Sequence, residues 1–227
     1  MIWLLTTLIV FYLARLISKR LQHPIVNPLL ICLVIIIPLL MWLNVPYTEY
    51  MAQNKWLNYL LEPAVVALAF PLYEQLSQIR QKWKVILSAC LVGSLLSMIV
   101  GASIALSMGA SPELTASILP KSVTTPIAMA VADQIGGVPA IAAIMVIIAG
   151  LFGAVFGYPL FKLFGIHAPI AKGLTMGTVS HALGTAKAAE ENHQEGAFSS
   201  LALVICGIFT SILAPVVYPI ILMVFGY

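Results

Sequence analysis

The sequence predicts an all-α polytopic membrane protein with about eight hydrophobic segments in two related halves, two of these segments being discontinuous or re-entrant. Of its 227 residues, 61% are hydrophobic and 8% are charged, and the mean hydropathy is +1.04. A water-soluble domain with this composition would lack the polar side chains to cover its surface. The apolar runs reach the roughly 20 residues that a helix needs to cross a bilayer. They do not alternate with polar residues as the strands of an outer-membrane barrel do.

The expected spans follow one another with short connections. The first has no basic residues before its apolar core and no small-residue cleavage site after it, so we interpret it as a span rather than a removable signal peptide. The predicted spans are 2–18, 28–44, 58–77, 85–108, 113–134, 138–163, 173–190 and 197–225.

Basic residues predict the orientation in the membrane. One cluster follows the first span and another follows the third, and the positive-inside rule places both in the cytoplasm and the N-terminus outside. Lys162 and Lys172 flank the connection between the sixth and seventh spans, which eight full crossings would place outside. Either 113–134 or 173–190 is therefore expected to enter and leave on one side. The two clusters are Arg15, Lys19 and Arg20, and Arg80, Lys82 and Lys84.

Internal similarity predicts two halves, 1–109 and 113–227, within a single transmembrane domain over 1–227. Three short segments of the first half resemble segments that follow in the same order about 110–120 residues later, as in secondary transporters with duplicated halves. The pairs are 5–15 with 123–133, 27–36 with 138–147, and 66–75 with 181–190.

The stretch 118–137, "ILPKSVTTPIAMAVADQIGG", is polar for a membrane segment. Pro120 and Pro126 predict an interrupted helix, and Thr125 is the expected N-cap of its second part. A buried helix N-terminus beside a lysine and several hydroxyls suits a small anion. Alternatively, the lysine extends to the membrane interface and the hydroxyls bond to their own helix. The candidate binding residues are Lys121, Ser122, Thr124 and Thr125.

A second interruption is expected within 177–200, where Gly184 reads as a helix stop and Thr185 as a new N-cap. Ser180, His181 and Thr185 are the candidate binding residues of this segment. Because imidazole changes charge near neutral pH, His181 is also a candidate for carrying a coupling proton. The alternative is that His181 is a packing residue whose nitrogens are satisfied inside the helix.

Charged residues in or near the spans are candidates for function, because a charge in the membrane interior costs about 3 kcal/mol or more. Glu62 and Asp133 are therefore further candidates for proton coupling, although both also fit helix ends in the headgroup region. A group of charged residues before the last span reads as a solvated turn, in which Glu195 would alternatively cap the last helix. This group is Glu190, Glu191, His193 and Glu195.

The sequence has no motif of a known catalytic site, so we expect neither an enzyme nor a bound cofactor or metal. Cys32, Cys90 and Cys206 lie in apolar runs without metal-ligand spacing and read as packed hydrophobic residues. A basic stripe for nucleic acid is also missing. Small residues at 93–103 and 149–157 permit close helix approach within the monomer or across a dimer, and we expect a homo-oligomer.

Four motifs in order resemble the LrgB/CidB family of bacterial inner-membrane proteins, and the resemblance covers nearly the whole chain. They are "LEPAVVALAFPLYEQL", "ASILPKSVTTPIAMAV", "GTVSHALGTAKA" and "QEGAFSSLAL". The resemblance implies a multi-pass protein of the bacterial inner membrane with a small companion of the LrgA/CidA type. It also implies one of two roles, a holin-like or antiholin-like modulator of murein hydrolase export and autolysis, or a translocator of small acids such as glycolate, glycerate and pyruvate.

The residues themselves favour a carrier for a small monocarboxylate, driven by protons or by exchange. Together with the resemblance, the expected acids are glycolate, glycerate, pyruvate or lactate. Hydrogen-bond donors outnumber acceptors in the two interrupted segments, as a carboxylate ligand requires. A holin-like or antiholin-like pore or regulator is the alternative. Such a pore would act by oligomerisation and would not need polar helix breaks at a defined depth.

Overall fold

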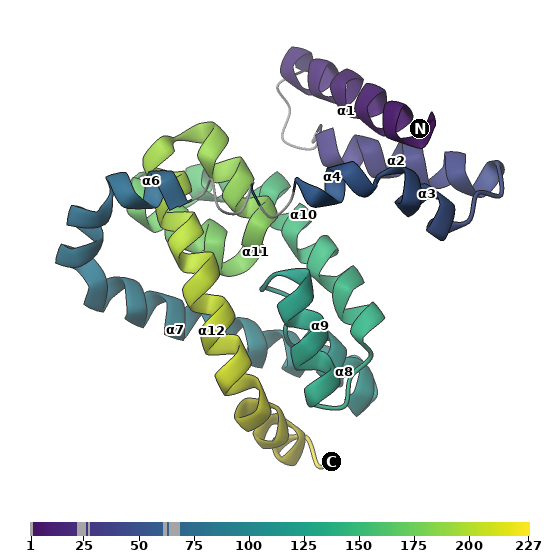
Figure 1. Ribbon diagram of the computed structural model, residues 1–227. Coiled ribbons are helices and arrows are strands. Elements are labelled where there is room, and N and C mark those ends of the chain that lie inside the picture. The colour runs from purple at the N-terminus through teal and green to yellow at the C-terminus, as the bar shows by residue number, and fades with distance from the viewer. Residues whose placement is uncertain (1, 22–25, 27, 61–62, 64–68) are drawn as a thin grey trace. The chain divides into compact units, whose positions relative to one another are not determined.

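The computed structural model describes residues 2–21, 26, 28–60, 63 and 69–227, which are mostly helical and include no β-strand (Figure 1). The chain divides into two compact units, Met1–Leu68 and Ala69–Tyr227. Each unit has a hydrophobic core of its own. The predicted duplication of 1–109 in 113–227 remains a prediction.

The first unit is a small helical assembly around Ala14, Cys32 and Ile36, which are buried together where α1 packs on α2. The hydroxyls of Thr7 and Tyr50 lie 2.8 Å apart and connect α1 to α3. The described helices of this unit are α1 (Ile2–Leu21), α2 (Pro28–Trp42), α3 (Tyr47–Gln53) and α4 (Lys55–Tyr59).

The second unit contains the polar segments that the sequence singled out. Several of its helices begin at signals that the sequence carries, among them a proline in the first turn of α8, α9, α10 and α11. Its helices are α6 (Ala69–Glu74), α7 (Leu76–Ser107), α8 (Pro112–Ile118), α9 (Thr125–Gln134), α10 (Pro139–Leu163), α11 (Pro169–Glu191) and α12 (His193–Val224).

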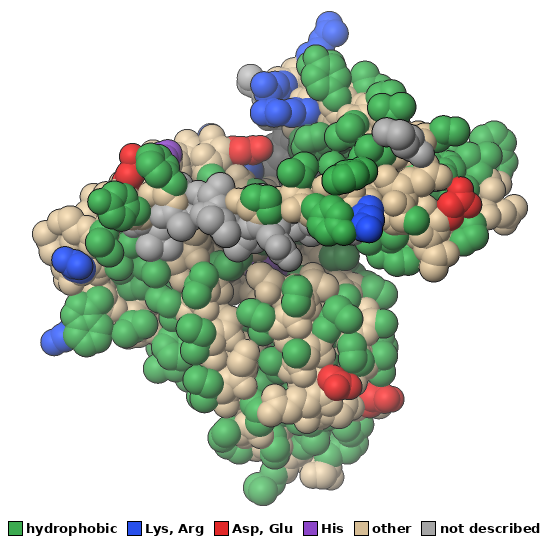
Figure 2. Space-filling model, viewed as in Figure 1, with side chains coloured by type: hydrophobic (Ala, Val, Ile, Leu, Met, Phe, Trp, Pro, Cys, Tyr) green, Lys and Arg blue, Asp and Glu red, His purple; other side chains and the backbone are tan. Residues whose placement is uncertain are grey.

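Four described helices, α1, α7, α10 and α12, are long and apolar enough to cross a membrane, whereas the sequence predicted about eight spans. The helix α2 has only 15 residues, and much of the predicted span 58–77 lies outside the described residues. Apolar side chains cover much of the visible surface (Figure 2). Their exposure would be unfavourable in water and fits contact with lipid.

The helix α7 begins at Leu76, nine residues before the span predicted there, so its basic cluster lies within a helix and not in a loop. At about 1.5 Å per residue this 32-residue helix is about 48 Å long, more than a hydrocarbon core of about 30 Å. The helix is therefore long enough for its exposed basic turns to lie outside the hydrocarbon core.

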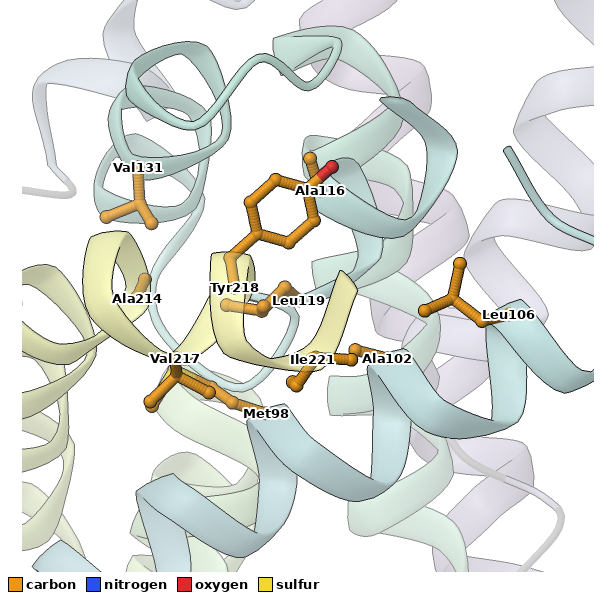
Figure 3. Packing of buried hydrophobic residues seen from close by; sticks show 10 residues of the cluster. All are labelled: Met98, Ala102, Leu106, Ala116, Leu119, Val131, Ala214, Val217, Tyr218 and Ile221. Atoms are coloured by element: carbon orange, nitrogen blue, oxygen red, sulfur yellow. The ribbon is translucent and has the colours of Figure 1, made fainter. Parts of the chain in front are cut away.

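The helices α7 and α12 run in the same direction. Gln78 bonds to Gln194 near their starts, and Cys90 lies beside Cys206 further along both helices. At the other end, Tyr218 of α12 donates a hydrogen bond to the carbonyl of Pro112, just after α7. The apolar cluster between them includes residues of α7, α8, α9 and α12 (Figure 3).

The helix α11 folds back on itself at His181, whose backbone is not helical (φ 42°, ψ −133°). Contacts with α12 show the reversal. Gly173 lies against Glu195 and Gly177 against Ser199, in increasing order along both helices.

Beyond His181 the order is reversed, because Thr185 bonds to Ser199 and Ala189 lies against Gly196. The limb 169–180 is thus parallel to α12 and the limb 182–191 is antiparallel to it. We call these two limbs the α11 hairpin and the residues around His181 its tip.

Glycines allow the hairpin to approach its neighbours. A side chain at Gly184 would collide with the backbone of Met176 in the other limb. On α10, Gly150 faces His181, Gly153 faces Ser180 and Gly157 faces Met176, so α10 runs antiparallel to the first limb. The small residues of 149–157 therefore pack against the hairpin inside this unit.

Candidate functional site

The first polar interruption lies between α8 and α9, at residues 119–124. As predicted, the chain is not helical there, but α9 begins at Thr125 and its N-cap is Thr124. The prediction of Thr125 as N-cap is therefore wrong by one residue. The hydroxyl of Thr124 makes no capping bond, which leaves the first amides of α9 without this side-chain partner.

Lys121 and Ser122 both turn toward α7. The Nζ of Lys121 donates to the backbone carbonyl of Ser97 at 2.8 Å, with the Ser97 hydroxyl at 3.3 Å. The hydroxyls of Ser97 and Ser122 are 2.7 Å apart. Within the described chain, no carboxylate lies at ion-pair distance from the Lys121 ammonium. Lys121 is therefore a half-buried cation without an anionic partner there.

A narrow crevice adjoins these contacts. Hydroxyls from α7, α11, α12 and the first interruption converge on it, and Met98, Leu119 and Pro120 supply apolar contacts. The lining residues leave no space for a molecule as large as water, so the crevice is too narrow to hold a solute in this structure. The hydroxyl-bearing lining residues are Ser94, Ser97, Ser122, Thr178 and Thr210.

The second interruption is at His181 and not at Gly184 and Thr185 as the sequence predicted. Both latter residues are helical, and the Thr185 hydroxyl donates to the His181 carbonyl at 2.8 Å and contacts the Ser199 hydroxyl. Thr185 therefore joins the hairpin to α12 instead of capping a helix. The prediction misread Gly184, which serves the close approach of the two limbs.

The tip of the hairpin is buried against α10. The Nε2 of His181 lies 2.8 Å from the carbonyl oxygen of Val146, which only accepts, so Nε2 carries the hydrogen. Ser180 is 1% exposed and its hydroxyl has no hydrogen-bond partner in the described chain. Val146 also packs in one cluster with Val123 of the first interruption. Both interruptions thus approach the same part of α10.

A family model described as the LrgB-like family matches residues 7–220. The chain belongs to the LrgB-like family. It is 47% identical over 215 residues to an uncharacterized protein of Haemophilus influenzae, covering 95% of this chain and 93% of that protein.

Two staphylococcal relatives of this LrgB-like protein carry the name "Holin-like protein CidB". The protein of Staphylococcus epidermidis is 33% identical over 213 residues, with 94% of this chain and 93% of the relative covered. That of Staphylococcus aureus is 32% identical over 216 residues, with coverages of 95% and 94%. No solved structure matches the chain.

In this LrgB-like protein, the predicted site residues are distributed over several contacts. Ser122 lines the crevice, and Lys121 reaches the crevice through Ser97. Thr124 and Thr125 are half-buried and do not line it. Ser180, His181 and Thr185 are buried at the hairpin, outside the crevice lining.

The two carboxylates predicted for proton coupling are Asp133 and Glu62. Asp133 is exposed near the end of α9, as expected of a helix-end group. Glu62 lies outside the described residues.

Four hydroxyl residues of the crevice were missed by reasoning from the sequence. Ser94 and Ser97 lie three residues apart, so they share one face of α7, but this stretch read only as a small-residue packing motif. The sequence signal that could have identified Ser94 and Ser97 is a pair of hydroxyls at helical spacing inside a predicted span. Thr178 and Thr210 complete the set only through tertiary packing.

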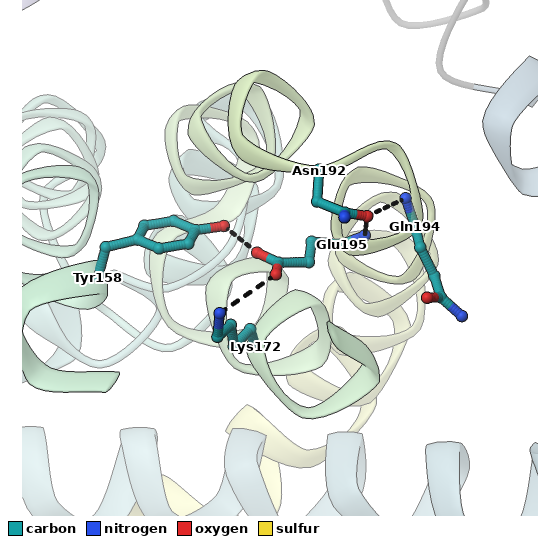
Figure 4. A network of polar contacts seen from close by, with 5 residues as sticks. All are labelled: Tyr158, Lys172, Asn192, Gln194 and Glu195. Atoms are coloured by element: carbon teal, nitrogen blue, oxygen red, sulfur yellow. Dashed lines mark hydrogen bonds and ion pairs between the residues drawn. The ribbon is translucent and has the colours of Figure 1, made fainter. Parts of the chain in front are cut away.

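Glu195 is not part of a solvated turn, nor does it cap α12. The cap is Asn192, whose side-chain oxygen accepts from the amides of Gln194 and Glu195 (Figure 4). Glu195 is 4% exposed; its carboxylate accepts a hydrogen bond from Tyr158 and lies 3.4 Å from the Nζ of Lys172. Its predicted companions Glu190, Glu191 and His193 are exposed.

Proposed function

We propose that this LrgB-like protein carries a small monocarboxylate, of the glycolate, glycerate, pyruvate or lactate type, across the bacterial inner membrane. The observation that supports this best is Lys121, a cation held inside the unit by Ser97 without a carboxylate partner among the described residues. A cation removed from water is unfavourable unless it is paired. A ligand carboxylate would provide the pairing.

The crevice beside Lys121 suits the rest of such a ligand. Hydroxyl groups both donate and accept hydrogen bonds, so they can contact a carboxylate and also a hydroxyl or keto oxygen. Because the crevice is too narrow even for water, transport requires it to widen, and this fits a carrier that exposes its site by a conformational change. His181 is the proposed proton carrier.

The distribution of charge supports an orientation. The starts of α7 and α12, the end of α10 and both feet of the α11 hairpin share one end of the second unit. The opposite end carries Glu113 and Asp133 and no basic residue. We therefore propose that the basic end is cytoplasmic. Its basic residues are Arg80, Lys82, Lys84, Lys162, Lys172 and Lys187.

In this orientation the α11 hairpin would enter and leave from the cytoplasm. Its limbs, 169–180 and 182–191, are about 18 and 15 Å long at about 1.5 Å per residue. Each is about half of a hydrocarbon core of about 30 Å, so the tip would lie near the middle of the bilayer. The second unit would then cross the membrane through α7, α10 and α12, with its C-terminus outside.

The test is uptake of labelled two- and three-carbon acids by proteoliposomes that contain the protein with its LrgA/CidA-type companion. Saturable uptake of at least one acid is expected, and Lys121→Ala should reduce it about 10- to 100-fold, as for the loss of a hydrogen bond to a charged group. Lys162→Ala is the matched control, because Lys162 is exposed at the end of α10. No saturable uptake, or equal uptake by both variants, would contradict the carrier.

A holin-like role is the second candidate, and the names of the staphylococcal relatives favour it over the carrier. A holin-like pore would release large solutes without a specific acid. Release of a large dye from the same vesicles, unchanged in Lys121→Ala, would support this role. Retention of the dye together with acid uptake would exclude it. Both roles are compatible with a homo-oligomer, which stays a prediction.

A further inference from the structure

We propose that the α11 hairpin is a gate for the crevice, and that Glu195 of α12 latches it shut at its base through Tyr158 and Lys172. We call these three residues the base latch. The proposal rests on the proposed function in one respect, because transport is the reason why the crevice must open. The motion itself is a property of the chain, whichever solute passes.

The hairpin is placed to act as a gate because it supplies part of the crevice wall. Thr178, in its first limb, lines the crevice, and its hydroxyl lies 3.4 Å from the Sγ of Cys206 on α12. Ser180 and His181 follow two and three residues later and pack against α10. A displacement of this limb would separate Thr178 from the lining residues of α7 and α12, and the crevice would widen.

The base latch lies at the opposite end of the same limb. Lys172 is on the first turn of α11, Glu195 is on the first turn of α12, and Tyr158 is near the end of α10. One carboxylate therefore contacts two other helices at once: Oε2 accepts from the phenol and Oε1 faces the ammonium at 3.4 Å (Figure 4). This makes Glu195 the common partner of the latch.

The second limb is held at the same place. The Nζ of Lys187 lies 5.8 Å from the centre of the Tyr158 ring, as does the Nζ of Lys172. Both feet of the hairpin thus gather around one aromatic ring, a favourable position for a cation. Lys187 is also paired with Glu191 at the surface.

The other charges near the latch belong to separate contacts. On α12, His193 faces Glu74 of α6 at 3.4 Å, and the neutral pair Gln78 and Gln194 joins α7 to α12 beside Glu195. Among the described carboxylates only Glu195 is buried. Loss of its charge would leave Lys172 without its ion-pair partner and would weaken the hold on the hairpin.

The experiment is hydrogen–deuterium exchange of the full chain in lipid nanodiscs, without any solute. In Glu195→Gln, the amides of α11 should exchange about tenfold faster than in the wild type, a modest figure for the loss of a buried ion pair. The amides of α7 and α10 should be unchanged. The matched control is Glu191→Gln, which removes a carboxylate that is exposed and paired within α11.

Unchanged exchange of α11 in Glu195→Gln, or an equal increase in Glu191→Gln, would overturn the latch. If Glu195→Gln accelerates every helix, Tyr158→Phe decides, because it keeps the ring and removes only the phenol hydroxyl. Faster exchange confined to α11 in Tyr158→Phe would then support the proposal, and no change would overturn it. Since no acid is present, a failed latch is distinguishable from a failed carrier.

Discussion

Ser94 differs from the other serines of the crevice in its hydrogen bonding. It is 3% exposed, and its hydroxyl has no oxygen or nitrogen partner within the described chain; it faces only the thiol of Cys206, a weak hydrogen-bonding group. Ser97 and Ser122, by contrast, bond to each other. A buried hydroxyl without a partner is unfavourable by about 1–3 kcal/mol. Its presence in the wall of a candidate site suggests that a ligand, rather than the fold, uses it.

This contrast gives a prediction for two substitutions. Ser94→Ala should leave thermal stability unchanged or raise it, because it removes an unsatisfied group, and should lower acid uptake. Ser122→Ala should reduce the stability by about 1 kcal/mol, since it breaks the bond to Ser97. Thermal unfolding in detergent and uptake in vesicles measure the two effects. A clear loss of stability in Ser94→Ala would contradict this account.

The sequence singled out Lys121 and Ser122 because they are polar in an apolar segment, and the structure places both at the crevice. Polar residues between prolines are a local signal. The positions of Ser94 and Thr178 are not local, because their convergence depends on how α7 and α11 pack. Glu195 was misplaced for the same reason: its neighbours along the chain are exposed, whereas its partners Tyr158 and Lys172 come from other helices.

At the scale of elements, the α11 hairpin depends on close backbone contact with α12. A side chain at Gly177 would meet the carbon of the Ser199 carbonyl group at 2.9 Å, a backbone atom that cannot rotate away. At Gly207 it would meet only a methyl end of Ile127, at 3.0 Å. These two glycines therefore differ in how rigid their neighbours are.

We expect Gly177→Ala to destabilise the protein by about 1–3 kcal/mol, the usual cost of overpacking a close interface. Gly207→Ala should have a much smaller effect, because the Ile127 side chain can adjust. Unfolding temperatures of the two variants under the same conditions provide the comparison. Equal destabilisation would mean that the hairpin is not held by this contact.

The position of the interruption in α11 could not be predicted from local sequence patterns. Gly184 and Thr185 have the chemistry of a helix end, but Gly184 is helical because its missing side chain admits Met176 of the other limb. The turn is instead at His181, in a backbone conformation that non-glycine residues seldom adopt. Contacts between the tip and α10 hold the turn at His181. The residues that neighbour His181 in the sequence give no sign of these contacts.

For the whole molecule, composition alone was enough to predict a helical membrane protein, because so few residues are polar. The number of spans stays a prediction, since four described helices are long and apolar enough to cross. A count of apolar segments does not distinguish one straight helix from two short limbs that fold back on each other, as the limbs of α11 do.

The proposed orientation can be tested with single cysteines placed in a chain whose Cys32, Cys90 and Cys206 are replaced by alanine. Ala168→Cys and Glu190→Cys mark the two feet of the hairpin, and Tyr227→Cys marks the C-terminus. We expect an impermeant thiol reagent to label Tyr227→Cys in intact cells, and the other two only after the membrane is permeabilised. Labelling of Ala168→Cys and Glu190→Cys from opposite sides would show that α11 crosses the membrane.

The parallel pairing of α7 with α12 has a consequence for biogenesis. Contacts such as Gln78 with Gln194 and Pro112 with Tyr218 join residues more than one hundred positions apart. During synthesis, α7 leaves the ribosome long before α12 is made. We therefore expect the translocon or a chaperone to cover the polar serines of α7 until α12 can pack on them. A prematurely terminated chain that ends before α12 would keep this helix unmatched, and we expect the cell's quality-control proteases to remove it.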